Sequence, residues 1–137
     1  NGKYRLSNGN YCEKTMYFYV LALVDSETRK AVIPMRSSNL TPGRELNNLI
    51  QNLRATDDKG TFRPAAYSAV FNLKTAGKSW GDKNWHVYKP SKVRMLDMSN
   101  QDDASVYQMA QKLQAEAFKG ATQPKYEKVD SAKEDIA

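Results

Sequence analysis

The stretch Thr15-Met-Tyr-Phe-Tyr-Val-Leu-Ala-Leu-Val24 is dominated by aromatic, branched and other apolar residues. These side chains occupy both alternating faces of an extended segment, which is typical of a strand buried on each side. The stretch therefore predicts a central β-strand, and the rest of the domain is interpreted around it.

The segments beside this strand predict a hairpin. A polar turn at residues 25–30 leads to a second apolar segment at residues 31–37, so the two strands are expected to pair antiparallel. Pro34 lacks the N–H of a strand ladder, which places the second strand near an edge or a bulge. Residues 1–14 are polar and predict only a ragged first strand. Their start without Met predicts that a further N-terminal segment precedes them.

The next segment has the features of an amphipathic helix. Thr41 and Pro42 form the pattern of an N-cap followed by proline at the first helical position. After this pattern, four apolar residues follow one another at helical spacing: Leu46, Leu49, Ile50 and Leu53. A charged loop at residues 55–64 follows the predicted helix.

The second half of the chain predicts another hairpin and a last helix. Alternating residues at 67–74 indicate a half-exposed strand, and a flexible connection at 76–83 leads to strands at 85–88 and 92–96. The return arm of this long hairpin is expected to break at Pro90. A helix from about residue 103 to 119 ends at Gly120.

This order of elements predicts a mainly β, α+β domain over residues 1–120. The specific expectation is an antiparallel five-stranded barrel of the oligonucleotide-binding (OB) kind, with one helix between strands 3 and 4 and one C-terminal helix. Residues 121–137 are expected to form a flexible polar tail. The 40% hydrophobic and 26% charged residues are ordinary for a globular domain.

The charge of the chain is unevenly distributed. The whole chain has a net charge of +6, and residues 59–94 contain eight basic residues against one acid, a net charge of +7. This segment therefore carries the entire excess, which favours a polyanionic partner.

The residues needed for most catalytic chemistry are scarce. One cysteine, Cys12, and one histidine, His86, supply neither a disulfide, nor a usual zinc site, nor a nucleophile with its base. The acidic pairs 57–58 and 102–103 are interpreted as turn and helix-cap residues. Residues 76–79, Ala-Gly-Lys-Ser, lack the earlier glycine of a phosphate-binding loop. The sequence predicts neither an enzyme nor a cofactor or metal.

Basic and aromatic side chains alternate between Arg63 and Arg94, which is typical of a surface for single-stranded nucleic acid. Cations would follow the phosphates while rings stack on bases. The alternative is that Phe71, Trp85 and Tyr88 belong to the core and the lysines form a solvated face. The candidate binding residues are Arg63, Lys74, Lys78, Trp80, Lys83, Trp85, Tyr88, Lys89 and Arg94.

Several segments together resemble small proteins of tailed bacteriophages, in particular phage single-stranded DNA-binding proteins. The resemblance runs from Tyr17 to Gly120 and is carried by residues 19–24, 31–40, 63–67 and 78–81. It implies a non-catalytic role as an accessory protein in phage replication or recombination. The chain departs from such proteins at its end, Lys133-Glu-Asp-Ile-Ala137, which is only mildly acidic and lacks a terminal aromatic residue.

The sequence thus favours a DNA-binding protein in the host-cell cytoplasm, with single-stranded DNA rather than RNA as partner. No membrane association is expected, and a homodimer and contacts with replication proteins are left open. The alternative is a protein-interaction or virion component that uses the same sheet, supported by the apolar strands at residues 16–24 and 31–35. A metal-dependent nuclease would rest only on scattered aspartates.

Overall fold

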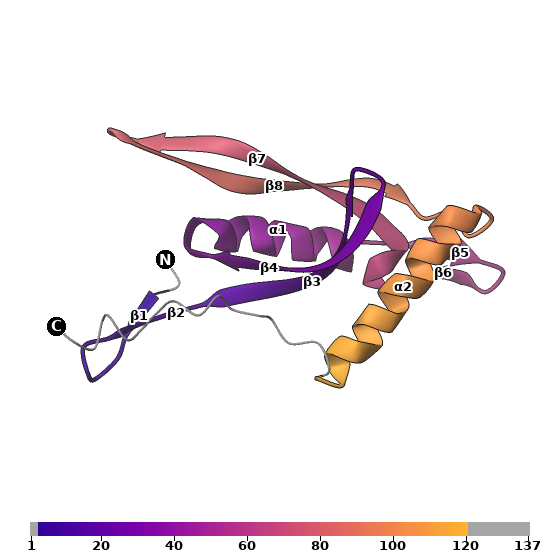
Figure 1. Ribbon diagram of the computed structural model, residues 1–137, viewed down its shortest axis with the longest axis horizontal. Helices are drawn as coiled ribbons and strands as arrows, with labels where there is room; N and C mark the ends of the chain where they lie inside the picture. The colour runs from indigo at the N-terminus through magenta and orange to yellow at the C-terminus, as the bar shows by residue number, and fades with distance from the viewer. Residues whose placement is uncertain (1–2, 121–137) are drawn as a thin grey trace.

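The computed structural model describes residues 3–120, which fold into four antiparallel hairpins and two α-helices (Figure 1). Helix α1 (Leu40–Gln51) lies between the two long hairpins, and helix α2 (Gln101–Phe118) crosses one side of the molecule. The long hairpins are β3 (Thr15–Val24) with β4 (Glu27–Arg36), and β7 (Ala69–Trp80) with β8 (Lys83–Met95). The short hairpins are β1 (Lys3–Arg5) with β2 (Tyr11–Glu13), and β5 (Ala55–Asp57) with β6 (Gly60–Phe62).

The mainly β, α+β class is confirmed, but the predicted closed five-stranded barrel is not formed by residues 3–120. Each described strand is hydrogen-bonded only to its neighbour in the chain, so every sheet has two strands. A barrel would need ladders between hairpins. Here α1 occupies the space between the two long hairpins and packs against both, which keeps their strands apart.

The β3–β4 hairpin is closed by a tight two-residue turn. Asp25 and Ser26 have φ angles of 48° and 67°, and Val24 pairs directly with Glu27. Two positive φ values are the signature of a type I′ turn, whose twist matches that of the strands. The return strand therefore begins at Glu27 rather than at residue 31, because the polar residues predicted as a turn continue the ladder.

Only one face of β3 is covered by α1. Met16 and Met35 pair across the hairpin and face the helix, where a Cβ on Gly43 would lie 3.1 Å and 3.3 Å from their sulfur atoms. Tyr17 and Tyr19 point to the other face and are exposed. The prediction of a central strand buried on each side is therefore wrong, because the sheet has one other strand and β3 is at its edge. β4 is the opposite edge, as Pro34 indicates.

Helix α1 begins two residues earlier than the Thr41-Pro42 pattern suggests. Its N-cap is Asn39, which places Pro42 in the first turn, where no intrahelical N–H is needed. The Asn39 side chain does not cap the helix but accepts a 2.9 Å hydrogen bond from the backbone N–H of Tyr88 in β8. The side chain at the N-cap position thus contacts the β7–β8 hairpin instead of capping the helix.

The β7–β8 hairpin is longer than predicted because Pro90 does not break it. The turn is Gly81-Asp82, with Gly81 at φ 63°, and residue pairs alternate between hydrogen-bonded and open from there. Pro90 pairs with Leu73 at an open position, so its missing N–H removes no ladder bond. The segment expected to be a flexible connection is instead the end of the ribbon.

The remaining elements refine the other expectations. The charged loop at residues 55–64 contains the short β5–β6 hairpin, whose turn is held by Asp57 Oδ1 accepting from the Lys59 N–H at 2.8 Å. Helix α2 begins at Gln101, capped by Asn100, and Gly120 follows its end at φ 71° as a stop residue. The predicted tail at 121–137 lies outside the described residues.

The hydrophobic core gathers where the hairpins meet the helices. Within the described range, no helix has the length and apolar character needed to cross a membrane. The buried apolar side chains come from β4, α1 and its C-terminal end, β8 and α2: Met35, Leu40, Leu46, Leu53, Val87 and Leu113.

Candidate nucleic-acid interface

The strand register brings most of the candidate residues to one face of the β7–β8 ribbon. Directly opposed residues of an antiparallel pair project from the same face, and the faces alternate along each strand. The pairs Lys74–Lys89, Lys78–Trp85 and Trp80–Lys83 are separated by even steps. We call this set the lysine face, consisting of Lys74, Lys78, Trp80, Lys83, Trp85 and Lys89.

The two tryptophans of the lysine face differ in exposure. Trp80 is 83% exposed at the end of the ribbon, directly before the Gly81-Asp82 turn. Trp85 is half-buried, and Val87 on the same face is only 7% exposed because the ribbon packs on α1 there. Trp80 therefore has an open ring, whereas Trp85 belongs partly to the interior, as the alternative interpretation expected.

The lysines of this face have no acidic partners among residues 3–120. All four side chains are exposed, and the ion pairs of the described range are formed by other basic residues. Lys74 and Lys89 are directly opposed, an arrangement that destabilises a strand pair through charge repulsion. An anion that bound here would relieve this repulsion.

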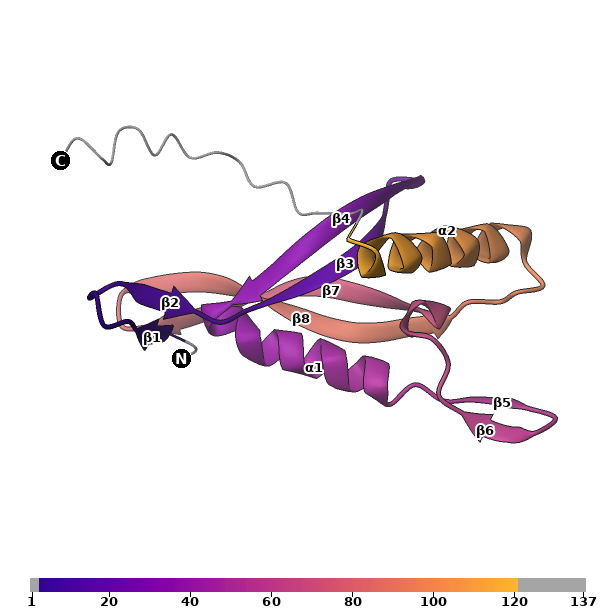
Figure 2. The same ribbon diagram turned by 90° about the horizontal axis from the view of Figure 1, so that it is seen from below.

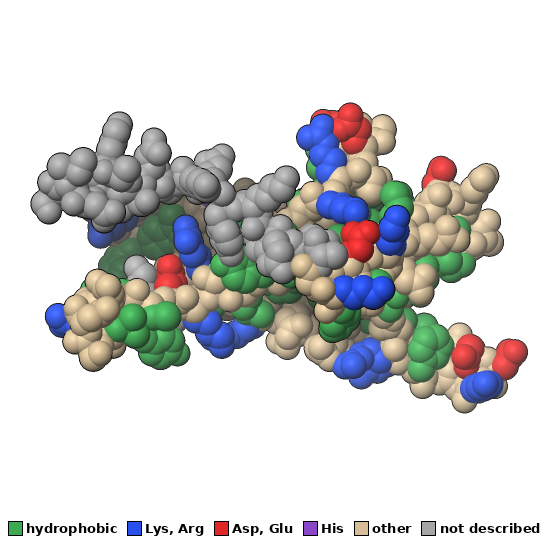
Figure 3. Space-filling view, turned by 60° about the horizontal axis from the view of Figure 1, so that its bottom comes forward, with side chains coloured by type: hydrophobic (Ala, Val, Ile, Leu, Met, Phe, Trp, Pro, Cys, Tyr) green, Lys and Arg blue, Asp and Glu red, His purple; other side chains and the backbone are tan. Residues whose placement is uncertain are grey.

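The other described hairpins have mixed charges. Acidic and basic side chains lie side by side at the ends of β3–β4 and β5–β6 (Figure 3). At the first end Arg29 and Glu27 form an ion pair at 2.5 Å, and at the second Lys59 follows Asp57 and Asp58. A local carboxylate thus neutralises Arg29, whereas none of the ion pairs within residues 3–120 involves a lysine of the lysine face.

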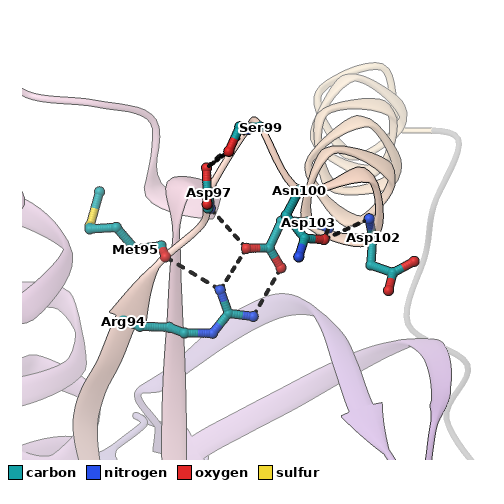
Figure 4. Close-up of polar contacts among 7 residues, drawn as sticks. All are labelled: Arg94, Met95, Asp97, Ser99, Asn100, Asp102 and Asp103. Atoms are coloured by element: carbon teal, nitrogen blue, oxygen red, sulfur yellow. Dashed lines mark hydrogen bonds and ion pairs between the residues drawn. The ribbon is translucent and has the colours of Figure 1, made fainter.

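Arg94 is not part of the lysine face. Its guanidinium donates hydrogen bonds of 2.6 Å and 2.9 Å to the two carboxylate oxygens of Asp103 in the first turn of α2 (Figure 4). Asp103 is 7% exposed and also accepts from the backbone N–H of Asp97 at 2.8 Å. Arg94, with the Asp97 N–H, lowers the pKa of Asp103 to about 2. The charge expected to contact phosphate is thus already paired.

Arg63 and Tyr88 are also placed elsewhere. Arg63 follows β6, at the opposite end of the molecule from the β7–β8 turn (Figure 1), and donates to the side-chain oxygen of Gln51 in α1. Tyr88 pairs with Thr75 on the other face of the ribbon and is half-buried. Six of the nine candidate residues therefore share one face, and Arg63, Tyr88 and Arg94 do not.

The acidic pair at 57–58 lies at a turn as expected, whereas the pair at 102–103 lies in the first turn of α2 and the cap residue is Asn100. Asp57 holds the β5–β6 turn, while the backbone N–H groups of Asp102 and Asp103 donate to the Asn100 cap at 2.9 Å and 3.2 Å. Between residues 3 and 120, no cluster of three or more histidine, cysteine or acidic side chains is placed to hold a metal ion. His86 lies in β8 on the exposed face opposite the lysine face, pairing with Gly77.

Sequence reasoning overlooked an aromatic arm at the N-terminal end. Tyr4 and Tyr11, in the β1–β2 hairpin, are 62% and 70% exposed, and Arg5 pairs with Tyr11. The β1–β2 arm and the end of the β7–β8 ribbon extend toward the same end of the molecule in both Figure 1 and Figure 2. The sequence signal for this arm was weak, because its two strands have only three residues each and are surrounded by Gly, Ser and Asn residues.

Comparison with known proteins gives one match. The family model described as Pam3 phage gp34-like protein matches residues 1–123, a range that includes all four hairpins and both helices. Searches of curated proteins and of solved structures give no match. The match confirms the expected phage origin at the level of the family. The chain belongs to the Pam3 phage gp34-like protein family and is a bacteriophage protein.

Proposed function

We propose that this protein binds single-stranded nucleic acid, without catalysis and with weak sequence selectivity, on the lysine face of the β7–β8 ribbon. The observation that carries the proposal is that four exposed lysines, none of them in an ion pair within residues 3–120, share one face of the β7–β8 ribbon with the 83% exposed ring of Trp80. Cations beside an open ring are the two elements by which single strands are held.

The energetics favour a strand whose bases are unpaired. Each phosphate neutralised by a lysine releases condensed counterions, and a base stacked on an exposed ring contributes on the order of 1–3 kcal/mol. In a duplex the base faces are already stacked on one another, so Trp80 would gain nothing there. Weak selectivity follows because lysine–phosphate contacts and stacking read no base edges.

The proposal includes DNA rather than RNA as the partner and an accessory role in phage replication or recombination. Its support is the resemblance of residues 17–120 to phage single-stranded DNA-binding proteins, together with membership of a phage family. The chemistry of the lysine face itself suits any flexible polyphosphate strand with accessible bases.

Titration with a single-stranded oligonucleotide tests the proposal through tryptophan fluorescence. Quenching is expected at low salt, because a base stacks on Trp80, and affinity should fall as salt rises. With four lysine–phosphate contacts, the slope of log K against log salt is expected to be about −3. Unchanged fluorescence at low salt, or an affinity indifferent to salt, would contradict the proposal.

A second candidate function is a protein-interaction or virion component. The observation that favours it is the exposed apolar surface of the β3–β4 hairpin, where Tyr19 and Leu23 are 41% and 48% exposed. A discrete complex with another phage protein, formed equally in the presence and absence of DNA on size-exclusion chromatography, would support this function over the first.

A further inference from the structure

The end of the β1–β2 arm repeats the chemistry found at the end of the β7–β8 ribbon. Directly beside its turn the ribbon has the opposed pair Trp80 and Lys83, and the arm has the opposed pair Arg5 and Tyr11, so each ends on a ring next to a cation. The corresponding pairs of the other two described hairpins each contain a carboxylate: Val24–Glu27 and Asp57–Gly60.

The ring and the cation are exposed at both ends. Trp80 is 83% exposed and Tyr11 is 70% exposed, while Lys83 and Arg5 are exposed as well. Neither cation forms an ion pair within residues 3–120. Over the same range, no hydrogen bond joins residues 4–13 to another element, because the bonds of the arm are internal. The fold therefore makes no use of the side chains at the end of the arm.

The arm and the free end of the ribbon start from one short segment. Arg36 pairs with Thr15, which is the first residue of β3 and follows the arm. Three residues later, Asn39 accepts the 2.9 Å hydrogen bond from the N–H of Tyr88 in the ribbon. The residues between them form the 3₁₀ turn Ser37–Asn39, so three steps of roughly 2 Å each separate the two attachment points. The bases of the arm and of the free end of the ribbon thus lie close together.

Both ends project past the start of α1 toward the same end of the molecule, as Figures 1 and 2 show. Val87 is buried where the ribbon packs on α1, and Lys83 lies four residues beyond it, roughly 13 Å at about 3.3 Å per residue. Val87 is on the same face of the ribbon as the lysine face, and the arm continues β3 on the other side of α1. The lysine face is therefore on the side of the ribbon nearer to the arm.

The route between the two ends is positively charged. Arg36 lies where the arm and the ribbon start, and Lys14 joins the arm to β3. Both are exposed and neither forms an ion pair within the described range. In the sequence, residues 3–14 contain three basic residues and one acid. This charge complements a polyanion that leaves the lysine face in the direction of the arm.

We propose that the β1–β2 arm is a second contact for the single strand bound by the lysine face, so that one strand runs from Trp80 across the start of α1 to Tyr11. Tyr11 stacks on a base, while Arg5 and Arg36 contact phosphates. The inference rests on the proposed function and adds the length of strand that the protein recognises.

Titrations with labelled oligonucleotides of about 4 to about 16 nucleotides, the range of site sizes known for single-strand binding domains, test this contact by fluorescence anisotropy. The unaltered chain should bind the longest oligonucleotide more tightly than the shortest. The slope of log K against log salt should be steeper for the longest by about 1.4, because two phosphate contacts of roughly 0.7 each are added.

A matched pair of double variants separates the arm from a general effect of length. Arg5→Gln/Tyr11→Ala removes the cation and the ring of the arm, and Lys59→Gln/Phe62→Ala removes a cation and a 45% exposed ring from the β5–β6 hairpin at the opposite end of the molecule. The arm variant should bind the longest oligonucleotide about 5- to 150-fold more weakly, the effect of one lost stack, and the shortest with little change. The control variant should bind both like the unaltered chain.

Two further variants guard against an arm that has simply unfolded. Arg5→Lys/Tyr11→Phe keeps a cation and a ring and should retain the tight binding of the longest oligonucleotide. If circular dichroism shows that Arg5→Gln/Tyr11→Ala is not folded, Arg5→Glu replaces it, because it reverses one exposed charge and leaves Tyr11 in place. Arg5→Glu should also weaken binding of the longest oligonucleotide selectively.

The arm contact is overturned if a folded arm variant binds the longest oligonucleotide like the control, or loses as much affinity for the shortest as for the longest. The proposed function is judged separately by Trp80→Ala with the shortest oligonucleotide. A loss of affinity there keeps the lysine face as the binding site even if the arm variants have no effect. If the unaltered chain binds no oligonucleotide of any length, both proposals are contradicted.

Discussion

Arg94 and Asp103 join the end of β8 to the first turn of α2 through two parallel hydrogen bonds of 2.6 Å and 2.9 Å (Figure 4). Asp103 Oδ2 also accepts from the Asp97 N–H, so one carboxylate holds the connecting loop as well. The pair therefore fixes the position of the start of α2 relative to the β7–β8 hairpin. Its planar geometry suits arginine, and a lysine would not reproduce it.

This pair predicts a loss of stability in acid. The folded-state pKa of Asp103 is lowered to about 2 from an ordinary value of 3.8. Its contribution is therefore fully present above about pH 4 and lost as the pH falls toward 2. Thermal unfolding across this range should show Asp103→Asn with a lower melting temperature than the unaltered chain at neutral pH. The difference should shrink as the pH approaches 2, and a constant difference would contradict the assignment.

Removing cations from the lysine face should reduce the salt dependence of binding. The double variant Lys78→Gln/Lys83→Gln is expected to lower the magnitude of the log–log salt slope by about 1.4, since each single-strand phosphate contact contributes roughly 0.7. Lys59→Gln/Lys112→Gln makes the same change in net charge at exposed positions off this face. Equal effects of the two double variants in oligonucleotide titrations would exclude a localised binding face.

The open ring of Trp80 should contribute directly to binding. Trp80→Ala is expected to weaken the single-strand affinity by about 1–3 kcal/mol, because one stacked base loses its platform. Trp85→Phe, at the half-buried ring, should change the affinity far less. Fluorescence anisotropy of a labelled oligonucleotide measures both. A larger loss of affinity for Trp85→Phe than for Trp80→Ala would show that Trp80 is not the stacking ring.

The Asn39 side chain should hold the middle of β8 against the start of α1. Asn39→Ala leaves the half-buried N–H of Tyr88 without its 2.9 Å acceptor, which should cost about 1–3 kcal/mol of unfolding free energy. Asn39→Asp retains an acceptor and serves as the control. Hydrogen exchange at the Tyr88 amide should be faster in Asn39→Ala. Unchanged exchange would show that the contact contributes nothing.

The sequence predicted local elements well where their causes are local. The polar residues before Glu27 and the Gly81-Asp82 step give turns because Asp, Ser and Gly tolerate the required backbone angles. Counting by twos from Gly81-Asp82 would already have sorted four lysines and two tryptophans onto one face. That register, however, depended on recognising that Pro90 sits at an open position and does not end the strand.

The errors share a different cause. Thr15–Val24 has the composition of a central strand, yet it forms an edge, because no local signal states how many strands a sheet will contain. The barrel was wrong for the same reason, since α1 separates hairpins that a barrel would have joined. Thr41 is not the N-cap residue of α1: Asn39 occupies that position, and its side chain contacts β8 instead of capping the helix.

The sequence alone determined the two long hairpins, the two helices and the concentration of positive charge in the second half, because turn propensity, periodicity and charge are properties of neighbouring residues. Only the tertiary structure decided that Arg94 is neutralised while Lys78 is not, and that Trp80 is open while Trp85 is half-buried. Each of these depends on which distant segment packs nearby, and burial and ion pairing are set by that packing rather than by local sequence.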